Sequence, residues 1–123
     1  MADVVKSIMK RGVETAITAN NGAASQTIVW NRSDDNIMIR ATNSDAATAL
    51  LTFTGTGFGS GKAKTITLAQ NATKGIYLES FDVKDPATQK VTCTITNTNG
   101  TAYSGTVTNV KIEVIEAPKA LVD

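Results

Sequence analysis

Short segments in which apolar and polar residues alternate recur along the chain, and this alternation limits the fold more than any other feature. In the clearest segment, residues 90–96, Val91, Cys93 and Ile95 share one face and threonines occupy the other. A period of two is typical of a β-strand with one buried face. The same reasoning predicts further strands over residues 13–18, 26–30, 36–41, 48–53, 64–68, 75–83 and 107–116.

Turn residues separate these segments at intervals of about 8–12 residues, and no long helical pattern lies between them. With 123 residues, the chain has the length of one ordinary domain. We therefore expect an all-β fold: a single antiparallel β-sandwich, immunoglobulin-like, of about eight short strands. Its expected parts are an N-terminal arm over 1–12, the sandwich over 13–117 and a C-terminal tail over 118–123. The arm is expected to be an extended segment or an added edge strand.

Two Asn-Gly pairs and one change of phase predict how the strands connect. Asn-Gly favours a backbone with positive φ, so Asn21-Gly22 predicts a hairpin between the first two strands and Asn99-Gly100 predicts a later turn. Between residues 75 and 83 the apolar residues change parity, which predicts a bulge near residues 79–80.

Charge and composition exclude several classes of function. Twelve Lys and Arg against eleven Asp and Glu leave a net charge of +1, so we expect no nucleic-acid partner. No apolar run is long enough to span a membrane, and the N-terminus lacks a signal-peptide pattern, which favours synthesis in the cytoplasm. The chain has no His, and its one cysteine, Cys93, alternates with apolar residues and is expected in the core. No nucleophile, base and orienting group come together, so we expect no enzyme, no metal and no cofactor.

Three further features have simpler explanations than a catalytic or ligand site. The glycine-rich segment 55–62 lacks the glycine and the Ser or Thr that a phosphate-binding loop requires, so it reads as a loop between strands. The carboxylate pairs at 34–35 and at 79 and 82 fit solvated turns better than a calcium site. Trp30 is expected in the core, because the few aromatic residues are spread too widely to form a stacking platform.

The order of features resembles that of small proteins that decorate or cement the head shell of tailed bacteriophages. The elements that carry the resemblance extend over most of the chain: the basic lead Lys6–Arg11, the Asn21-Gly22 turn, Asn43-Ser44-Asp45-Ala46-Ala47, the glycine-rich turn Gly55–Gly61, Thr65–Leu68, Gly75–Phe81 and Val110–Ile115. The resemblance implies a β-sandwich, often trimeric, that binds the outside of an icosahedral capsid and stiffens it.

This resemblance implies a partner, a location and a set of contacts. The partner is the major capsid protein, the location is the outer capsid surface of the virion, and the chain is expected to be a homo-oligomer, with a trimer implied. Lys6, Lys10 and Arg11 form the only local basic cluster, which reads either as a solvated face or as an arm that docks on an acidic protein surface. We expect capsid contacts in the arm and in the glycine-rich loop, at Asp3, Lys6, Lys10, Arg11, Gly57, Phe58, Gly59 and Lys62.

Two other functions compatible with a β-sandwich stay open. One is a receptor- or carbohydrate-binding module of a phage tail or bacterial surface, which would need exposed aromatic residues or a bound calcium ion. Aromatic residues make up 5% of the chain, which weakens this reading. The other is a structural subunit of a tail or surface appendage, in which the arm would insert into a neighbouring copy.

Overall fold

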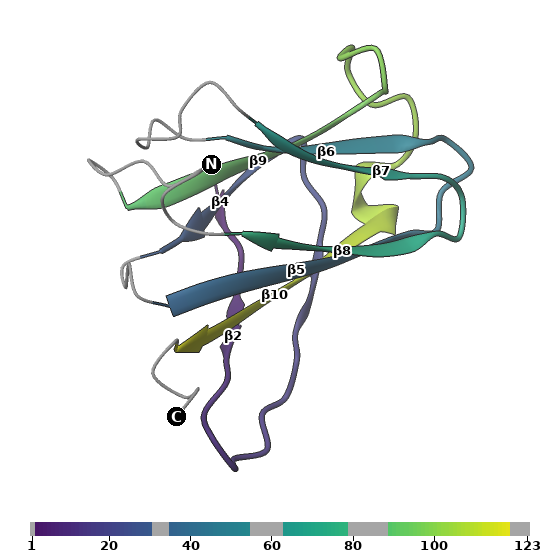
Figure 1. Cartoon of the computed structure of the whole chain (residues 1–123). Coiled ribbons are helices and arrows are strands. Elements are labelled where there is room, and N and C mark those ends of the chain that lie inside the picture. The colour runs from purple at the N-terminus through teal and green to yellow at the C-terminus, as the bar shows by residue number, and fades with distance from the viewer. Residues whose placement is uncertain (1, 31–34, 55–62, 79–88, 119–123) are drawn as a thin grey trace.

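Two β-sheets packed face to face make up the computed structural model, which describes residues 2–30, 35–54, 63–78 and 89–118 (Figure 1). Sheet A has the spatial order β1 (Ala2–Asp3), β4 (Ser25–Val29), β9 (Lys90–Thr96), β6 (Ala49–Thr54), β7 (Lys64–Leu68). Sheet B has the order β2 (Lys6–Ile8), β10 (Val110–Pro118), β5 (Asp35–Asn43), β8 (Thr73–Leu78), and β3 (Ala19–Asn21) also pairs with β10. The expected all-β sandwich is confirmed.

The core lies between the two sheets and is built from alternate residues of each strand. Trp30 and Phe53 are its largest apolar side chains. Cys93 is also buried in the core, as the alternation in β9 predicts. Full burial of a side chain such as Phe53 contributes about 1.5–3 kcal/mol to the free energy of folding. The other core residues include Ile28, Ile37, Ile39, Leu51, Ile66, Leu68, Leu78, Val91, Ile95, Val110, Ile112 and Val114.

Consecutive strands from β3 to β10 mostly alternate between the sheets, and only β6 and β7 are neighbours in both sequence and space. The two antiparallel sets β4-β9-β6-β7 and β3-β10-β5-β8 follow the strand order of a jelly roll. An immunoglobulin-like order is not confirmed. That order places its first two strands side by side in one sheet, whereas β3 and β4 lie in different sheets.

Most expected strands are present with small changes of boundary. The two segments 64–68 and 90–96 coincide with β7 and β9, and 26–30, 36–41 and 48–53 lie within one or two residues of β4, β5 and β6. For the expected strand 75–83 the structure describes β8, which ends at Leu78, so the predicted bulge at 79–80 lies outside the described residues.

Two expected strands are wrong in whole or in part. Residues 13–18 form no strand; only Val13 takes part in an isolated bridge, with Lys10. Val13 and Ile17 are exposed, so their alternation has no sheet face to cover. The last strand begins later than expected, because residues 107–109 form the short 3₁₀ helix η1 and β10 starts at Val110.

The Asn21-Gly22 pair forms no hairpin, since β3 and β4 belong to different sheets. Gly22 is buried, its N–H donates to the carbonyl oxygen of Val110 at 2.7 Å, and its φ is not positive. Asn99-Gly100 does form the expected turn: Gly100 has a φ of 86° and donates to the carbonyl oxygen of Asn97. Only the second pair uses the conformational freedom that Asn-Gly provides.

We expect Cys93 to react with a thiol reagent only as fast as the domain unfolds. Burial raises the pKa of its thiol to about 12, so the reactive thiolate is scarce in the folded chain. The measurement is the labelling rate in buffer and in denaturant, with glutathione as the exposed reference thiol. Fast labelling under native conditions would contradict the buried position of Cys93.

Candidate interaction surface

The N-terminal segment is part of the sandwich, as an edge strand of each sheet. β1 pairs in parallel with β4 of sheet A, and the N–H of Val4 donates to the carbonyl oxygen of Thr27 at 2.9 Å. β2 then pairs in parallel with β10 of sheet B. Along the same edge of β10, β3 covers residues 111–113 and β2 covers residues 114–116. Of the two forms expected for the arm, residues 2–8 adopt the edge strand.

Lys6, an expected capsid contact, is committed to an ion pair inside the fold. Its Nζ lies 2.7 Å from Oε1 of Glu116, and the side chains of Lys6 and Glu116 are 13% and 0% exposed. Oε2 of Glu116 has no hydrogen-bond partner among the described residues. Lys6 therefore neutralises a buried carboxylate and holds β2 against β10.

Asp3, another expected contact, is also bound within the domain. Its carboxylate accepts a hydrogen bond from the hydroxyl of Thr27 and lies 3.2 Å from the Nζ of Lys90. The hydrogen bond from Thr27, then that from Lys90, lowers the pKa of Asp3 below its usual value. These contacts fasten β1 to β4 and β9 at the margin of sheet A.

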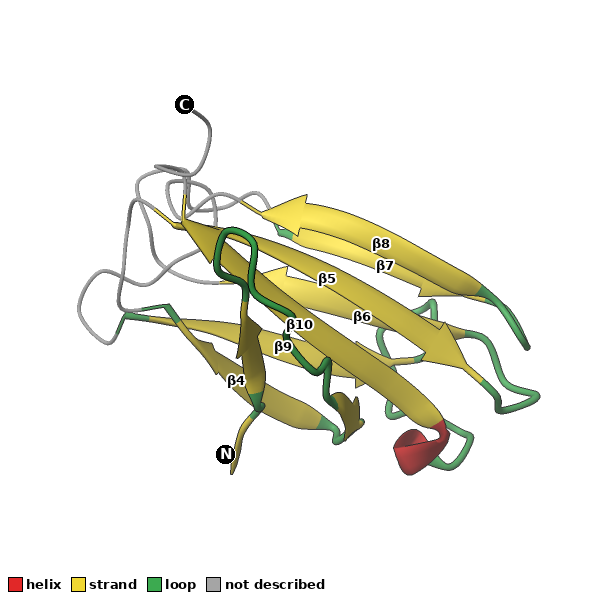
Figure 2. Cartoon of the chain, turned by 90° about the horizontal axis from the view of Figure 1, so that it is seen from below, coloured by secondary structure: helices red, strands yellow, loops and turns green. Residues whose placement is uncertain are grey.

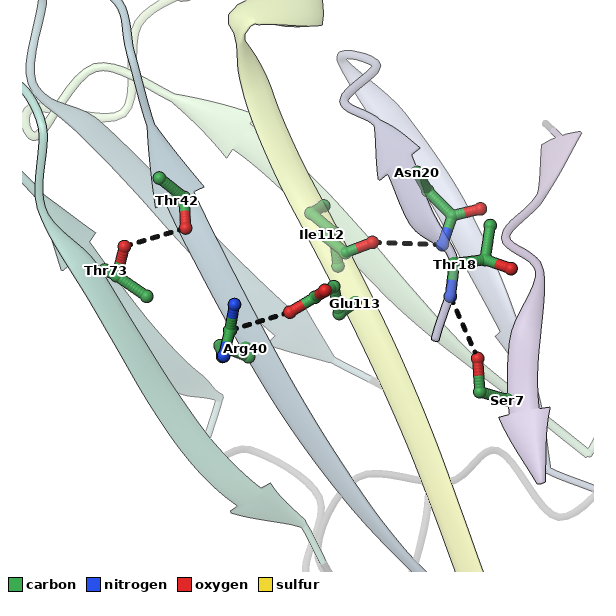
Figure 3. A network of polar contacts seen from close by, with 8 residues as sticks. All are labelled: Ser7, Thr18, Asn20, Arg40, Thr42, Thr73, Ile112 and Glu113. Carbon is green, nitrogen blue, oxygen red and sulfur yellow. Dashed lines mark hydrogen bonds and ion pairs between the residues drawn. The ribbon is translucent and has the colours of Figure 1, made fainter. Parts of the chain in front are cut away.

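Asn20 fixes the place where the N-terminal segment crosses to sheet B, a role that the sequence analysis missed. Its side-chain oxygen accepts from the N–H of Val5 at 2.9 Å, and its side-chain nitrogen donates to the carbonyl oxygens of Val5 and Ile112, each at 3.0 Å. Figure 3 shows the bond to Ile112. The amide thus acts as an extra piece of backbone between β2 and β10.

Residues 9–18 leave this edge as a projecting loop. It begins where the N–H of Met9 donates to the carbonyl oxygen of Glu116, and it returns where the N–H of Thr18 donates to Oγ of Ser7 at 3.1 Å (Figure 3). Its turn contains Gly12 with a φ of 70°. The loop stands out beyond sheet B, on the side away from sheet A (Figure 1).

The projecting loop exposes apolar and basic side chains together. Val13 is 53% exposed and Ile17 38%, and the expected contacts Lys10 and Arg11 are also exposed. Lys10 and Arg11 are thus the expected contact residues that lie on the projecting loop itself. Gly57, Phe58, Gly59 and Lys62 lie outside the described residues.

The outer face of sheet B carries an apolar row that crosses three strands. Tyr77 on β8 pairs with Met38 on β5, and Met38 pairs with Ile115 on β10. We call these three residues the apolar row. Tyr77 is 55% and Met38 46% exposed, whereas most outward residues beside them are polar. Figure 2 shows β8, β5 and β10 side by side in this layer.

Polar pairs occupy the neighbouring rows of the same face. Nε of Arg40 lies 2.7 Å from a carboxylate oxygen of Glu113, and the hydroxyls of Thr42 and Thr73 are 2.8 Å apart (Figure 3). Beyond them, Lys111 donates to the carbonyl oxygen of Thr108. The apolar row is therefore bordered by a polar band along its flank.

The outer face of sheet A has a different character, because hydroxyl side chains fill it. One row crosses four strands through the pairs Ser25–Thr94, Thr94–Thr52 and Thr52–Thr65. The rows on either side contain Thr27, Thr92 and Thr54, and Thr96, Leu50 and Thr67. The charged residue of these three rows among the described ones is Asp3, which pairs with Thr27 at the margin of the sheet. We call this surface the threonine face.

Asp45, in the connection between β5 and β6, holds that connection in place and forms no ligand site with the described residues. It accepts hydrogen bonds from the N–H groups of Ala47 and Thr106 and from the side chain of Asn109, and the first two of these bonds lower its pKa most. Tyr103 donates to the carbonyl oxygen of Ala47, and burial raises its pKa. All partners of Asp45 are groups of the fold itself.

Neither a metal site, nor a membrane helix, nor a known relative assigns a role to this surface. Within residues 2–30, 35–54, 63–78 and 89–118, no three Cys, Asp or Glu residues gather in a way that could hold a metal ion. In the same ranges, no helix has the length and apolar character needed to span a membrane. Comparison with protein-family models, curated proteins and solved structures finds no match.

Proposed function

We propose that this chain is a structural virion protein that decorates or cements the outside of a tailed-phage capsid by binding the lattice of the major capsid protein. In this proposal the chain is a homo-oligomer, for which a trimer is one form, and it works without catalysis, cofactor or metal. Its location is the outer surface of the virion, after synthesis in the host cytoplasm. The resemblance of its ordered sequence features to head decoration proteins supplies the identity of the partner.

The observation that carries the proposal is the projecting loop on its rigid base. Residues 9–18 expose Val13, Ile17, Lys10 and Arg11 together, beyond the body of the sandwich. Pairing of β1 and β2 with both sheets holds the start of the loop in place. Fixing the base of the loop lowers the conformational entropy that the loop loses on docking, which favours a role in binding a surface.

The jelly-roll order is compatible with this role without assigning it, because capsid proteins, lectins and enzymes all use that architecture. Binding at many equivalent positions compensates for the weak affinity of one contact. A protein bound at many equivalent positions of a shell, or an oligomer that engages several positions at once, gains avidity well above the affinity of a single contact. A small domain with a modest docking surface fits that mode of binding.

The test is co-sedimentation of the purified full chain with expanded phage heads assembled without it. Saturable binding that is absent on unrelated particles of similar size is the expected result. We expect a variant with Val13→Asp and Ile17→Asp to bind about 30-fold more weakly or worse, as for the loss of an interface hot spot. Because both residues are exposed, the variant is expected to keep the thermal midpoint of the wild type.

Two outcomes contradict the proposal. If the wild-type chain does not bind heads but assembles with itself into rods or rings, a tail or appendage subunit becomes the better assignment. If it binds glycans in place of heads, it is a receptor- or carbohydrate-binding module. Light scattering of the free protein, run beside the sedimentation, measures the oligomeric state that the proposal expects.

A further inference from the structure

We propose that the outer face of sheet B is the side that faces the shell, and that its partner is a protein surface with an apolar centre and an acidic rim. The inference rests on the proposed function and deepens it by naming the docking face and the chemistry of the partner. The contact is formed by the apolar row and the projecting loop together. The threonine face on the opposite side of the sandwich then points away from the shell.

The apolar row and the projecting loop are joined through Ser7 of β2. The row Tyr77–Met38–Ile115 leads to β2, because Ile115 pairs with Ser7. Oγ of Ser7 accepts the hydrogen bond from Thr18, which follows the exposed Ile17 of the loop. Exposed apolar side chains that gather on one side of a protein commonly mark a binding surface.

The apolar residues at the surface are concentrated on this side. Of the six exposed large apolar side chains among the described residues, four belong to the projecting loop or the outer face of sheet B: Val13, Ile17, Met38 and Tyr77. The other two, Val5 and Ile8, belong to the N-terminal edge segment. On sheet A, the row at the centre of the outer face consists of Ser25, Thr94, Thr52 and Thr65. The two outer faces therefore differ in chemistry, and only one resembles the core of a protein interface.

The charges around the apolar row and the projecting loop favour an acidic partner. Outward-facing side chains of sheet B and the loop carry four cations, Lys10, Arg11, Arg40 and Lys111, against two carboxylates, Glu14 and Glu113, among the described residues. Arg40 and Glu113 neutralise each other at 2.7 Å. The remaining excess is positive on a chain whose total net charge is only +1. Charge complementarity across an interface calls for carboxylates on the other side.

The same charges argue against a second copy of this chain as the occupant. Two copies packed through this face would bring their basic rims together, and juxtaposed like charges oppose association. A repeated shell subunit with acidic groups around an apolar spot has no such conflict. Salt should therefore weaken the binding, because screening reduces the attraction between exposed charges.

A pair of matched variants tests the face. Met38→Glu and Thr52→Glu each place one carboxylate on the outward side of an inner strand, β5 in sheet B and β6 in sheet A. In co-sedimentation with expanded heads, we expect Met38→Glu to bind about 30-fold more weakly and Thr52→Glu to bind within about twofold of the wild type. Raising the salt from about 0.1 to about 1 M, which shortens the Debye length from about 10 to about 3 Å, should weaken wild-type binding. Circular dichroism melts verify that both variants remain folded.

The outcomes separate this inference from the proposed function. If the wild type fails to bind heads, the proposed function fails, and the face assignment fails with it. If the wild type binds and Thr52→Glu is the damaging change, the threonine face docks and the inference alone is overturned. Equal binding by both variants also overturns it. If Met38→Glu converts an oligomer seen by light scattering into a monomer, a second copy covers the face, against the charge argument.

Discussion

A Gly22→Ala variant is expected to lose about 3 kcal/mol or more of its free energy of unfolding, measured by urea denaturation. A Cβ atom at position 22 would lie 2.6 Å from the carbonyl oxygen of Val107, 2.7 Å from that of Val110 and 2.8 Å from Cδ1 of Ile95. Two of these three atoms belong to the backbone, so no side-chain rotation relieves the overlap. A shift of the chain would also break the hydrogen bond from Gly22 to Val110.

Gly75→Ala is the matched control, because the same methyl group is added to a strand with room for it. The only atom near a Cβ at position 75 is the carbonyl oxygen of Ile39, at 3.4 Å, which is an ordinary contact. Glycine within a strand costs stability relative to alanine, so this variant should be as stable as the wild type or up to about 1 kcal/mol more stable. Similar losses in the two variants would contradict the close approach at Gly22.

The strands that alternation located correctly are those whose apolar face the core covers. Segments 64–68 and 90–96 have the same boundaries in the sequence and in the structure, because burial enforces their period of two. Segment 13–18 shows a similar alternation, yet Val13 and Ile17 are exposed and no neighbouring strand pairs with it. Periodicity alone does not reveal whether a sheet face is available to bury the apolar side.

The order of the strands could not be predicted from the sequence, because strand pairing depends on contacts between distant segments. Short connections between expected strands favoured hairpins, but in this fold most short connections carry the chain from one sheet to the other. Asn21-Gly22 illustrates the error. Glycine is required at position 22 because β3, η1 and β10 pack closely there. In the sequence, a glycine required for close packing cannot be distinguished from one required for a positive φ.

The candidate surface was located in part. Lys10 and Arg11 are exposed on the projecting loop, in the region where the basic cluster predicted docking. Lys6 belongs to the same cluster but points into the fold, because its partner Glu116 lies 110 residues further along the chain. Strands of two and three residues, such as β1 and β2, are too short to leave a periodic signal. The apolar row was missed because its three residues come from three strands whose register no local pattern reveals.

We expect Lys6→Met to cost about 3–5 kcal/mol of the free energy of unfolding, because it leaves the carboxylate of Glu116 buried without its cation. Glu116 has no exposed side-chain surface, and its Oε2 already lacks a partner among the described residues, so no other group there compensates. Urea denaturation measures the loss. Lys90→Met is the control, since it breaks the exposed pair between Lys90 and Asp3, and it should cost far less stability than Lys6→Met.

The double variant Lys6→Met with Glu116→Leu separates charge from packing. Replacing a buried ion pair by apolar residues is often neutral or stabilising, so the double variant should regain most of the stability lost in Lys6→Met. If it stays as unstable as the single variant, the lysine acts by packing and not by neutralising Glu116.

Tryptic cleavage after Lys10 and Arg11 gives a second measurement of the effect of Lys6→Met. Release of β2 from β10 frees the base of the projecting loop, so Lys6→Met should be cut faster there than the wild type.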